Sequence, residues 1–365
     1  MELLSFLQHY WWAVVSLLGA LLVFLLFVQG LQSLLLFSAK TTADKDLVCQ
    51  YAGHKWEITF TTLVTFGGAA FASFPLFYST SFGGAYWAWI VLLLLFVIQA
   101  ISFEFRNAAG NIVGPRLFEI FLFLNGALGT FVLGVAVGTL FSGGAFVMEK
   151  TAITDIGNPA ISYWANAWNG LDALANPFNL LLGLVVFFAA RTLGLLYAIS
   201  KPDNGEIGNI CRRKLLFSAL PFVLLFVAFV VWLFLRTGYR ANAAGQFEAV
   251  DYAYLLAMVE NPWILALLLL GVVAVLAGLI MQILGKMEDK NFYIVGAGVV
   301  LAVWAILMSA GFSGNAYYIS TIDPQMSLDL ANSSSSLFTL KVMAVVSLAV
   351  PFVLAYIAWA WRKMR

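Results

Sequence analysis

Long apolar runs separated by short polar joints dominate this sequence, and they constrain the fold more than any other feature. A membrane-spanning helix needs ~20 mostly apolar residues, because the hydrocarbon is ~30 Å thick and each residue rises ~1.5 Å. Since no water satisfies the backbone inside a bilayer, each such run is expected to be α-helical. The pattern predicts nine spans, at about 10–36, 55–77, 83–104, 117–141, 175–199, 215–236, 263–284, 292–312 and 338–361.

The composition supports a chain that folds in lipid. Hydrophobic residues make up 62% of the 365 residues and charged residues only 10%, whereas a soluble domain averages ~45–50% and ~25%. We therefore expect an all-α integral membrane protein in which residues 1–365 form a single polytopic domain. The net charge of +1 argues against a nucleic-acid partner, which would need a basic patch. Cys49 and Cys211 are too few for a disulfide framework or a zinc cluster.

The basic residues of the joints predict the orientation of the chain. Arg362, Lys363 and Arg365 end the sequence, which places the C-terminus in the cytoplasm by the positive-inside rule. An odd number of spans then places the N-terminus outside. The other joints predicted on the cytoplasmic side carry Lys40, Lys45, Arg106, Arg116, Lys201, Arg212, Arg213, Lys214, Lys286 and Lys290. The long outer loops predict an interfacial aromatic belt made of Trp164, Trp168, Tyr239, Tyr252, Tyr254, Trp263, Tyr317 and Tyr318.

The stretch GHKWEITF places His54, Lys55 and Glu57 at the start of the second predicted span. The basic cytoplasmic edge accounts for His54 and Lys55. With a period of 3.6 residues, Glu57, Thr61 and Thr65 share one helix face, which suggests a proton path with hydroxyl-bound water behind a carboxylate. The alternative is an interfacial Glu57 paired with Lys55, and threonines bonded to their own backbone. The residues alone leave both interpretations open.

Other ionisable residues fall near the ends of predicted spans. Glu104 and Arg106 end the third span, and form either a solvated edge or an ion pair with a neighbouring helix. Glu119 lies just inside the fourth span, where it can snorkel or pair with Arg116. Arg191 lies deeper, in the fifth span. An unpaired charge there is costly, so we expect a carboxylate or an anionic lipid as its partner.

The histidines argue against a haem held by this chain alone. Haem iron takes axial ligands such as His, Met, Cys or Tyr. The two histidines, His9 and His54, fall at opposite ends of the first two predicted spans, so they cannot share one iron. No carboxylate–histidine pattern suits another metal, and no nucleotide-binding fingerprint is present. We therefore predict no metal site and no cofactor bound by this chain alone.

Four ordered blocks of the sequence carry a family resemblance. They are WEITFTTLVTFGGAAFASFPLFYSTSFGGAYW from Trp56 to Trp87, FEFR at 103–106, NPF at 176–178 and SSSSLFTLKVM at 333–343. In a nine-span chain, these blocks resemble subunit II of the cytochrome bd quinol oxidases, and the likeness covers most of the chain. The resemblance implies a terminal oxidase of aerobic respiration that oxidises membrane quinol, reduces oxygen to water and builds a proton-motive force.

The resemblance also implies partners and a role for one carboxylate. A larger subunit I, the other half of a heterodimer in the bacterial cytoplasmic membrane, would carry haems b and d. Some relatives hold a structural quinone, and a small accessory subunit is a further potential partner besides lipids and the quinol pool. An acid that follows a Trp on the second helix is thought to help proton uptake, and this role carries over to Glu57, after Trp56. Trp56, Glu104, Arg106 and Arg191 are then structural or partner-facing.

The sequence departs from the family at the end of the first span. Where the family often has D-G-F-D, this chain has QGLQ, so Gln29 and Gln32 replace two acids with amides that release no proton. We expect no charge-dependent role there. The alternative to an oxidase subunit is a secondary transporter that uses Glu57 and Arg191. Such folds show paired discontinuous helices in repeated halves, and the sequence has no matched pair of interrupted spans.

Overall fold

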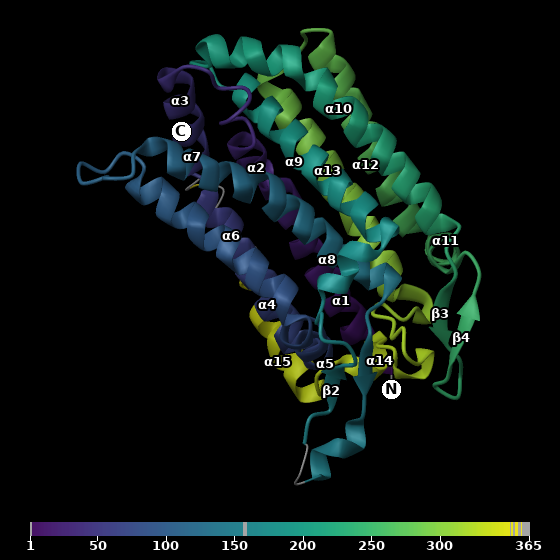
Figure 1. Cartoon of the computed structure of the whole chain (residues 1–365). Helices are drawn as coiled ribbons and strands as arrows, with labels where there is room; N and C mark the ends of the chain where they lie inside the picture. The colour runs from purple at the N-terminus through teal and green to yellow at the C-terminus, as the bar shows by residue number, and fades with distance from the viewer. Residues whose placement is uncertain (1, 156–158, 351, 353–354, 357–358, 360–365) are drawn as a thin grey trace.

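The computed structural model describes residues 2–155, 159–350, 352, 355–356 and 359. Long helices run side by side, and two antiparallel hairpins lie at one end of the bundle (Figure 1). The long helices are α1 (Glu2–Leu25), α4 (Trp56–Ser73), α6 (Tyr86–Phe105), α9 (Pro177–Ile199), α10 (Gly205–Phe234), α12 (Pro262–Ile283) and α13 (Glu288–Gly311). The shorter helices are α2 (Phe27–Gln32), α3 (Thr42–Gly53), α5 (Pro75–Tyr78), α7 (Pro115–Leu124), α8 (Thr130–Ser142), α11 (Ala253–Glu260), α14 (Leu330–Ser333) and α15 (Leu337–Ser347). The hairpins pair β1 (Phe146–Met148) with β2 (Ser162–Trp164), and β3 (Gly238–Ala241) with β4 (Phe247–Val250).

Seven helices within the described residues are long and apolar enough to cross a bilayer. These are Glu2–Gln32, Tyr86–Phe105, Pro115–Ser142, Pro177–Ile199, Gly205–Phe234, Pro262–Ile283 and Glu288–Gly314. Each coincides with one of the nine predicted spans. The second predicted span is occupied by α4, which ends before Pro75, and α15 occupies the start of the last. The count of nine spans therefore stays a prediction, as does the orientation of the termini.

Two spans begin well before the residues that the sequence predicts. The first begins at Glu2 and α10 begins at Gly205, instead of residues 10 and 215. The early start of α10 arises because Arg212, Arg213 and Lys214, which the sequence places in a joint, are part of the helix. A helix of 30 residues is ~45 Å long, which exceeds the hydrocarbon thickness. The first turns of α10 can therefore stand in the headgroup region.

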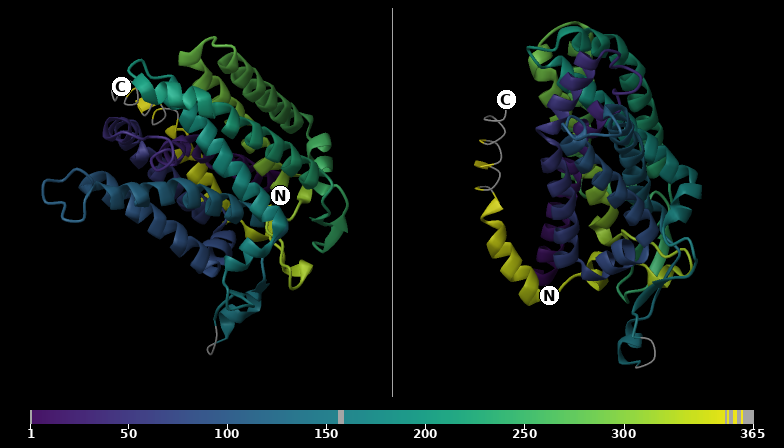
Figure 2. Two further views of the ribbon diagram at one scale, coloured as in Figure 1. Left: turned by 45° about the horizontal axis from the view of Figure 1, so that its top comes forward. Right: turned by 60° about the vertical axis from the view of Figure 1, so that its left-hand side comes forward.

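The core is built around α1. This helix packs against α4, α9, α13 and α15, and the second view in Figure 2 shows α15 lying along one side of the bundle. At the hairpin end, the ring of Trp12 contacts those of Phe74 and Tyr317. In contrast, only 28% of the residues in the most apolar stretch of α6, and of α10, are buried, so much of their surface is left for lipid or another chain.

The predicted aromatic belt is wrong for three of its members. Tyr254, Tyr317 and Tyr318 are at most 1% exposed, and they belong to the core. The hydroxyl of Tyr317 has a hydrogen-bond partner inside the core, because it lies 2.6 Å from Ser333 Oγ. Burial of a Tyr is favourable where its hydroxyl finds such a partner. The belt members that are exposed as expected include Trp168, Tyr252 and Trp263.

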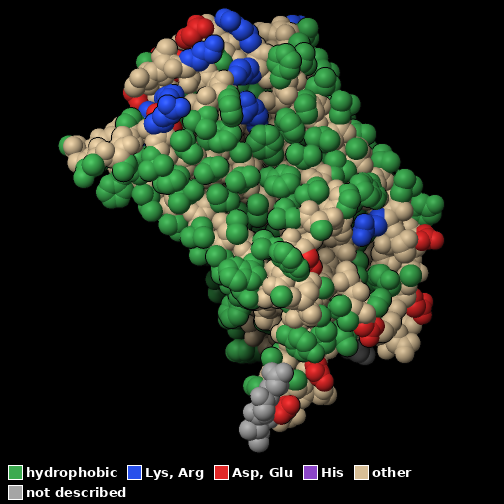
Figure 3. Space-filling model, in the orientation of Figure 1, with side chains coloured by type: hydrophobic (Ala, Val, Ile, Leu, Met, Phe, Trp, Pro, Cys, Tyr) green, Lys and Arg blue, Asp and Glu red, His purple; other side chains and the backbone are tan. Residues whose placement is uncertain are grey.

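Charged side chains are distributed unevenly along the bundle. Figure 3 shows Lys and Arg gathered at one end, a broad hydrophobic band, and Asp and Glu mainly toward the other end. The basic end is the one at which α3 and the start of α10 lie (Figure 1). We refer to it below as the basic end.

Cys49 and Cys211 are both free thiols.

Candidate functional site

A polar pocket of about 410 Å³ lies between α3, α4 and α6 at the basic end. Five of its lining residues are acidic or basic: Asp46, His54, Glu57, Glu104 and Arg106. The remaining lining residues are Cys49, Gln50, Gly53, Trp56, Ala100, Phe103 and Asn107. Residues from three separate helices thus converge, and the pocket brings together several groups that the sequence marked separately. We call it the Glu57 pocket.

The start of α4 positions Glu57. The chain leaves α3 at Gly53 and enters α4 at Trp56, so Glu57 falls in the first helical turn. A carboxylate is favoured there by the partial positive charge of the helix N-terminus. The Trp56 ring stacks on Phe103 of α6, with ring centroids 6.1 Å apart, which anchors the first turn to the neighbouring helix. The Glu57 side chain itself is exposed in this chain.

Lys55 does not occupy the solvated edge that the sequence predicts. The structure buries it to 2% exposure, whereas its neighbour His54 is exposed. Membrane topology therefore explains His54 but not Lys55.

Arg106 is the centre of a buried ion network beside the pocket. Its side chain is 4% exposed, and it donates to Asp46 Oδ1 at 2.6 Å and to Glu119 Oε1 at 2.9 Å. Lys45 donates to the second Glu119 oxygen at 2.7 Å. Of the two interpretations of Arg106, the ion pair with a neighbouring helix is confirmed. Neither alternative for Glu119 holds: it is 3% exposed, so it does not snorkel, and it faces Arg106 and Lys45 instead of Arg116.

The network holds α3 against α6 and α7, and α3 forms one wall of the Glu57 pocket. A capping box formed by Thr41 and Asp44 starts α3, which leaves the next two residues, Lys45 and Asp46, aimed at the network. Their role escaped the sequence analysis because they pair with residues 74 and 60 positions away. The thiolate of the nearby Cys49 is disfavoured at neutral pH, because burial raises the pKa of its thiol to about 11, even though Arg106 lowers it.

Thr61 and Thr65 lie outside the pocket. They follow Glu57 on the same face of α4, as the helical period predicts, and both are exposed in this chain. Thr65 Oγ1 donates to the carbonyl oxygen of Thr61 at 2.8 Å, which is the backbone-bonded arrangement that the sequence left as an alternative. The row formed by Glu57, Thr61 and Thr65 therefore lies on an open surface of the subunit.

The amides that replace two family acids are completely buried. Gln29 and Gln32 are 0% exposed, and Gln29 Nε2 donates to Gln99 Oε1 at 3.4 Å. Within the described residues, Gln29 Oε1, both Gln32 amide atoms and Gln99 Nε2 have no partner. Buried polar atoms of this kind are usually satisfied by ordered water. The cluster holds no charge of its own.

Arg191 lies apart from the Glu57 pocket, of which it is not a lining residue. It donates to Ser218 Oγ at 3.2 Å, to the Ser33 carbonyl oxygen at 3.0 Å and to Ser33 Oγ at 2.9 Å. Of the two expected partners, a carboxylate is not supplied by the described part of the chain, and an anionic lipid stays a prediction. Because Glu57 and Arg191 share no pocket, the transporter alternative loses its paired site.

The histidines do not fit a haem. His9 packs against Phe312 and its Nδ1 contacts the Ser5 carbonyl oxygen at 2.8 Å, near the N-terminus. His54 caps α3 at the basic end, which Figure 1 places at the opposite end of the bundle from the N-terminus. Among the described residues, no group of three or more His, Cys, Asp or Glu could hold a metal ion.

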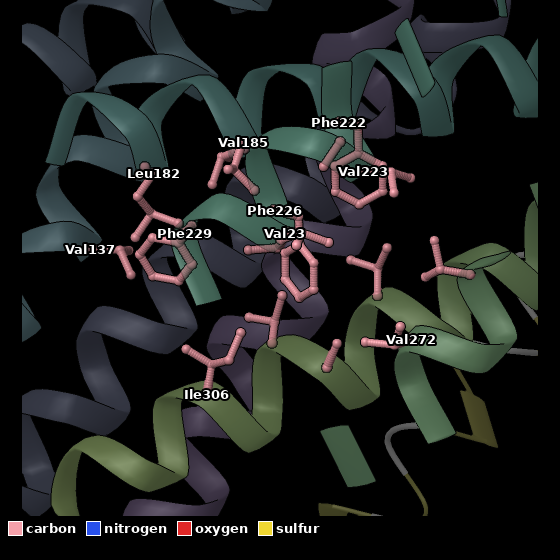
Figure 4. Close-up of a pocket in the computed structure, with 18 of the residues that line it drawn as sticks. Val23, Val137, Leu182, Val185, Phe222, Val223, Phe226, Phe229, Val272 and Ile306 are labelled. Carbon is pink, nitrogen blue, oxygen red and sulfur yellow. The ribbon is translucent and has the colours of Figure 1, made fainter. Parts of the chain in front are cut away.

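A second, apolar pocket lies between α8, α9, α10, α12 and α13. It has a volume of about 100 Å³ and no polar surface. Figure 4 shows Val185, Phe226 and Ile306 among the side chains that point into it. Such a lining suits a hydrocarbon ligand and provides no group for proton chemistry.

Comparison with known proteins assigns the chain to a family. The family model for cytochrome bd terminal oxidase subunit II matches residues 7–364. The probable cytochrome oxidase subunit 2 of Haemophilus influenzae is 26% identical, over 99% of this chain and 94% of its own length. Cytochrome bd-I ubiquinol oxidase subunit 2 of Escherichia coli is also 26% identical, over 98% and 94%. The corresponding Bacillus subtilis protein is 25% identical, over 90% and 87%.

The fold agrees with this assignment. A chain of the bd oxidase of Geobacillus thermodenitrificans superposes with a TM-score of 0.64 at 12% identity, over 98% of both chains. The seven apolar helices fit a multi-pass protein of the bacterial inner membrane, and the family is part of an oxidoreductase complex. On the family model that spans nearly its whole length, the chain belongs to the cytochrome bd terminal oxidase subunit II family.

Proposed function

We propose that this chain is the non-haem subunit of an oxidase that oxidises membrane quinol and reduces oxygen to water, and that its Glu57 pocket collects protons from the cytoplasm. One observation carries the proton role: a carboxylate in a polar pocket of about 410 Å³ at the basic end. The name of the Escherichia coli relative, a ubiquinol oxidase, supports quinol as the reductant. The basic end faces the cytoplasm in this proposal, with nine spans and the N-terminus outside.

Subunit I supplies the redox centres in this proposal. The haems b and d, which would transfer electrons to oxygen when bound, belong to that partner, because His9 lies in α1 near the N-terminus and His54 caps α3 at the opposite end of the bundle. A structural quinone could place its isoprenoid tail in the apolar pocket. That pocket has no polar surface, so it supplies no hydrogen bond for the quinone ring. Lipids, the quinol pool and a small accessory subunit complete the expected partners.

Glu57 is suited to exchange protons because its neighbours leave it accessible. Arg106 faces the same pocket, but Asp46 and Glu119 hold its guanidinium, so it does not need Glu57 as a counter-ion. Water in the pocket can therefore reach the Glu57 carboxylate. The row from Glu57 to Thr65 lies on an exposed face, so a continuous path along it needs another surface to enclose the water. We assign that surface to subunit I.

The test is oxygen consumption by the assembled oxidase. Glu57→Gln keeps size and hydrogen bonding but cannot carry a proton, so we expect turnover to fall by roughly tenfold, somewhat less than the ~10²–10⁴ for a direct acid–base group. Haem spectra and the amount of assembled complex should not change. Glu57→Asp should remain close to wild type. The matched control is Glu206→Gln, an exposed carboxylate at the basic end that does not line the pocket, which should have little effect. Wild-type turnover in Glu57→Gln would refute the proton role.

A further inference from the structure

Arg191 and Lys214 form a cationic pair on the α9–α10 side of the bundle, away from the Glu57 pocket. Lys214 Nζ donates to the Phe37 carbonyl oxygen at 2.9 Å and to Ser38 Oγ at 3.1 Å. Arg191 donates to the neighbouring Ser33 and to Ser218. All of these acceptors are neutral oxygens. These acceptors bring the two cations to one region, because Ser33 and Ser38 belong to one short segment and Ser218 lies one helical turn after Lys214 on α10.

Other basic residues of the same helix are neutralised within the chain. Arg212 pairs with Glu288 at 2.7 Å, and Arg213 lies 3.9 Å from Glu206. Within the described residues, Arg191 and Lys214 form no such pair. Two adjacent cations without a carboxylate indicate that an anion from outside the chain completes the site.

The position of Arg191 restricts the kind of anion. It lies eight residues before the end of α9 at Ile199, which is ~12 Å along the helix. Its side chain is partly buried, and its Nη2 makes no hydrogen bond among those described. A guanidinium binds phosphate oxygens through two parallel hydrogen bonds. A phosphate at the headgroup level, between Arg191 and the more peripheral Lys214, would satisfy both cations.

The surface beside the pair suits lipid chains. Phe37 is 67% exposed, and Leu216 and Phe217, which follow Lys214 on α10, are 55% and 78% exposed. Basic pockets between transmembrane helices on the cytoplasmic side bind anionic lipid headgroups in this way. We propose that Arg191 and Lys214 bind the phosphate of an anionic membrane phospholipid, whose acyl chains lie over Phe37 and Phe217. This site is independent of the proposed proton path.

The test measures lipid retained by the purified oxidase complex. The complex is delipidated, exchanged with vesicles of phosphatidylglycerol or of phosphatidylcholine, and analysed for bound lipid by native mass spectrometry. We expect wild type to retain phosphatidylglycerol preferentially. Arg191→Gln and Lys214→Gln should each weaken retention roughly fivefold, as expected for removal of one basic side chain near the membrane surface. Arg213→Gln is the matched control, because Arg213 is 76% exposed, and it should retain lipid like wild type.

Further measurements distinguish a lipid phosphate from free phosphate, and they include a second variant in case Arg191→Gln does not fold. Inorganic phosphate should not displace phosphatidylglycerol, and displacement at millimolar concentration would overturn the lipid assignment in favour of a free anion. Equal retention by wild type and Lys214→Gln would overturn the site itself. Lys214 is partly exposed, so that variant should assemble even if Arg191→Gln does not. Arg191→Lys, which keeps the charge but loses the bidentate geometry, should give intermediate retention.

Discussion

Arg106 and Arg191 are two arginines removed from water in one chain, and they are neutralised in different ways. Arg106 is 4% exposed and contacts two carboxylates, whereas Arg191 contacts only serine oxygens. Both guanidinium groups stay charged, because the pKa of arginine is far above neutral pH. The difference indicates that Arg106 is a structural element complete within the subunit, while Arg191 is completed by something outside it.

A similar contrast separates the carboxylates Glu119 and Glu57. Glu119 is buried, with each oxygen held by a cation. Glu57 is exposed and forms no ion pair among those described. Both Glu119 oxygens are therefore occupied and shielded from water, whereas the Glu57 carboxylate is open to water. Substitutions in the Arg106 network should therefore act on stability, and those at Glu57 on turnover.

The largest effect is expected from Arg106→Leu. This substitution leaves Glu119 buried with only Lys45 as counter-ion, and breaking a buried pair on one side costs about 3–5 kcal/mol. The lower end applies here, because Asp46 is 51% exposed and can be hydrated. The measurement is urea-induced unfolding of the detergent-solubilised complex.

Two further variants control the Arg106 result. Arg213→Gln, at an exposed arginine 3.9 Å from Glu206, should change stability by less than about 0.5 kcal/mol. The double variant Arg106→Leu, Glu119→Leu should recover part of the loss, because hydrophobic replacement of a whole buried pair is often neutral. A single variant as stable as wild type would show that the network is not structural.

Arg191→Gln should be less destabilising than Arg106→Leu. Its removal leaves neutral serine oxygens without a donor, which costs roughly 1–3 kcal/mol, and it leaves no unpaired charge in the chain. The measurement is the same urea titration, made in lipid-free detergent so that bound lipid does not contribute. A loss of stability equal to that of Arg106→Leu would mean that Arg191 has a charged partner within the subunit, and not only serine oxygens.

Glu57→Gln should hardly change stability, by less than about 0.5 kcal/mol, because the side chain is exposed. Glu119→Gln should instead destabilise by roughly 1–3 kcal/mol, since it leaves Arg106 and Lys45 with a weaker acceptor. Urea titration and oxygen consumption measured on the same preparations separate the two carboxylates. Equal losses of stability would remove the distinction between a structural and a proton-exchanging carboxylate.

The spans were predictable from the sequence because apolar length is a local property. Seven predicted spans coincide with helices of spanning length, and the position of Glu57 in the first turn of α4 follows from the pattern around Trp56. The start of α10 at Gly205 was missed because charged residues lower the hydropathy of a segment without ending its helix. The chain can form helix in the headgroup region, where charges stay hydrated.

The site itself was only partly predictable, because it depends on contacts between distant segments. The α3 helix is polar, so it looked like a joint, yet it supplies Asp46 to both the Arg106 network and the Glu57 pocket. Nothing in the sequence marked Ser33 and Ser218 as hydrogen-bond partners of Arg191. The periodicity did place Thr61 and Thr65 on the face of Glu57, but it could not tell that this face is left open by the rest of the chain.

Cys49 lies in α3, and the reactivity of its thiol reports on the Arg106 network. Because burial raises its pKa to about 11, the reactive thiolate should become about tenfold more abundant with each pH unit up to pH 10. Alkylation of Cys49, followed by mass spectrometry of the intact complex, should therefore accelerate over that whole range. Arg106 lowers this pKa, so Arg106→Leu should slow the reaction at a given pH wherever the variant stays folded. A rate that levels off near pH 9, as for an ordinary thiol, would show that α3 does not bury Cys49 and that the wall of the Glu57 pocket is looser than described.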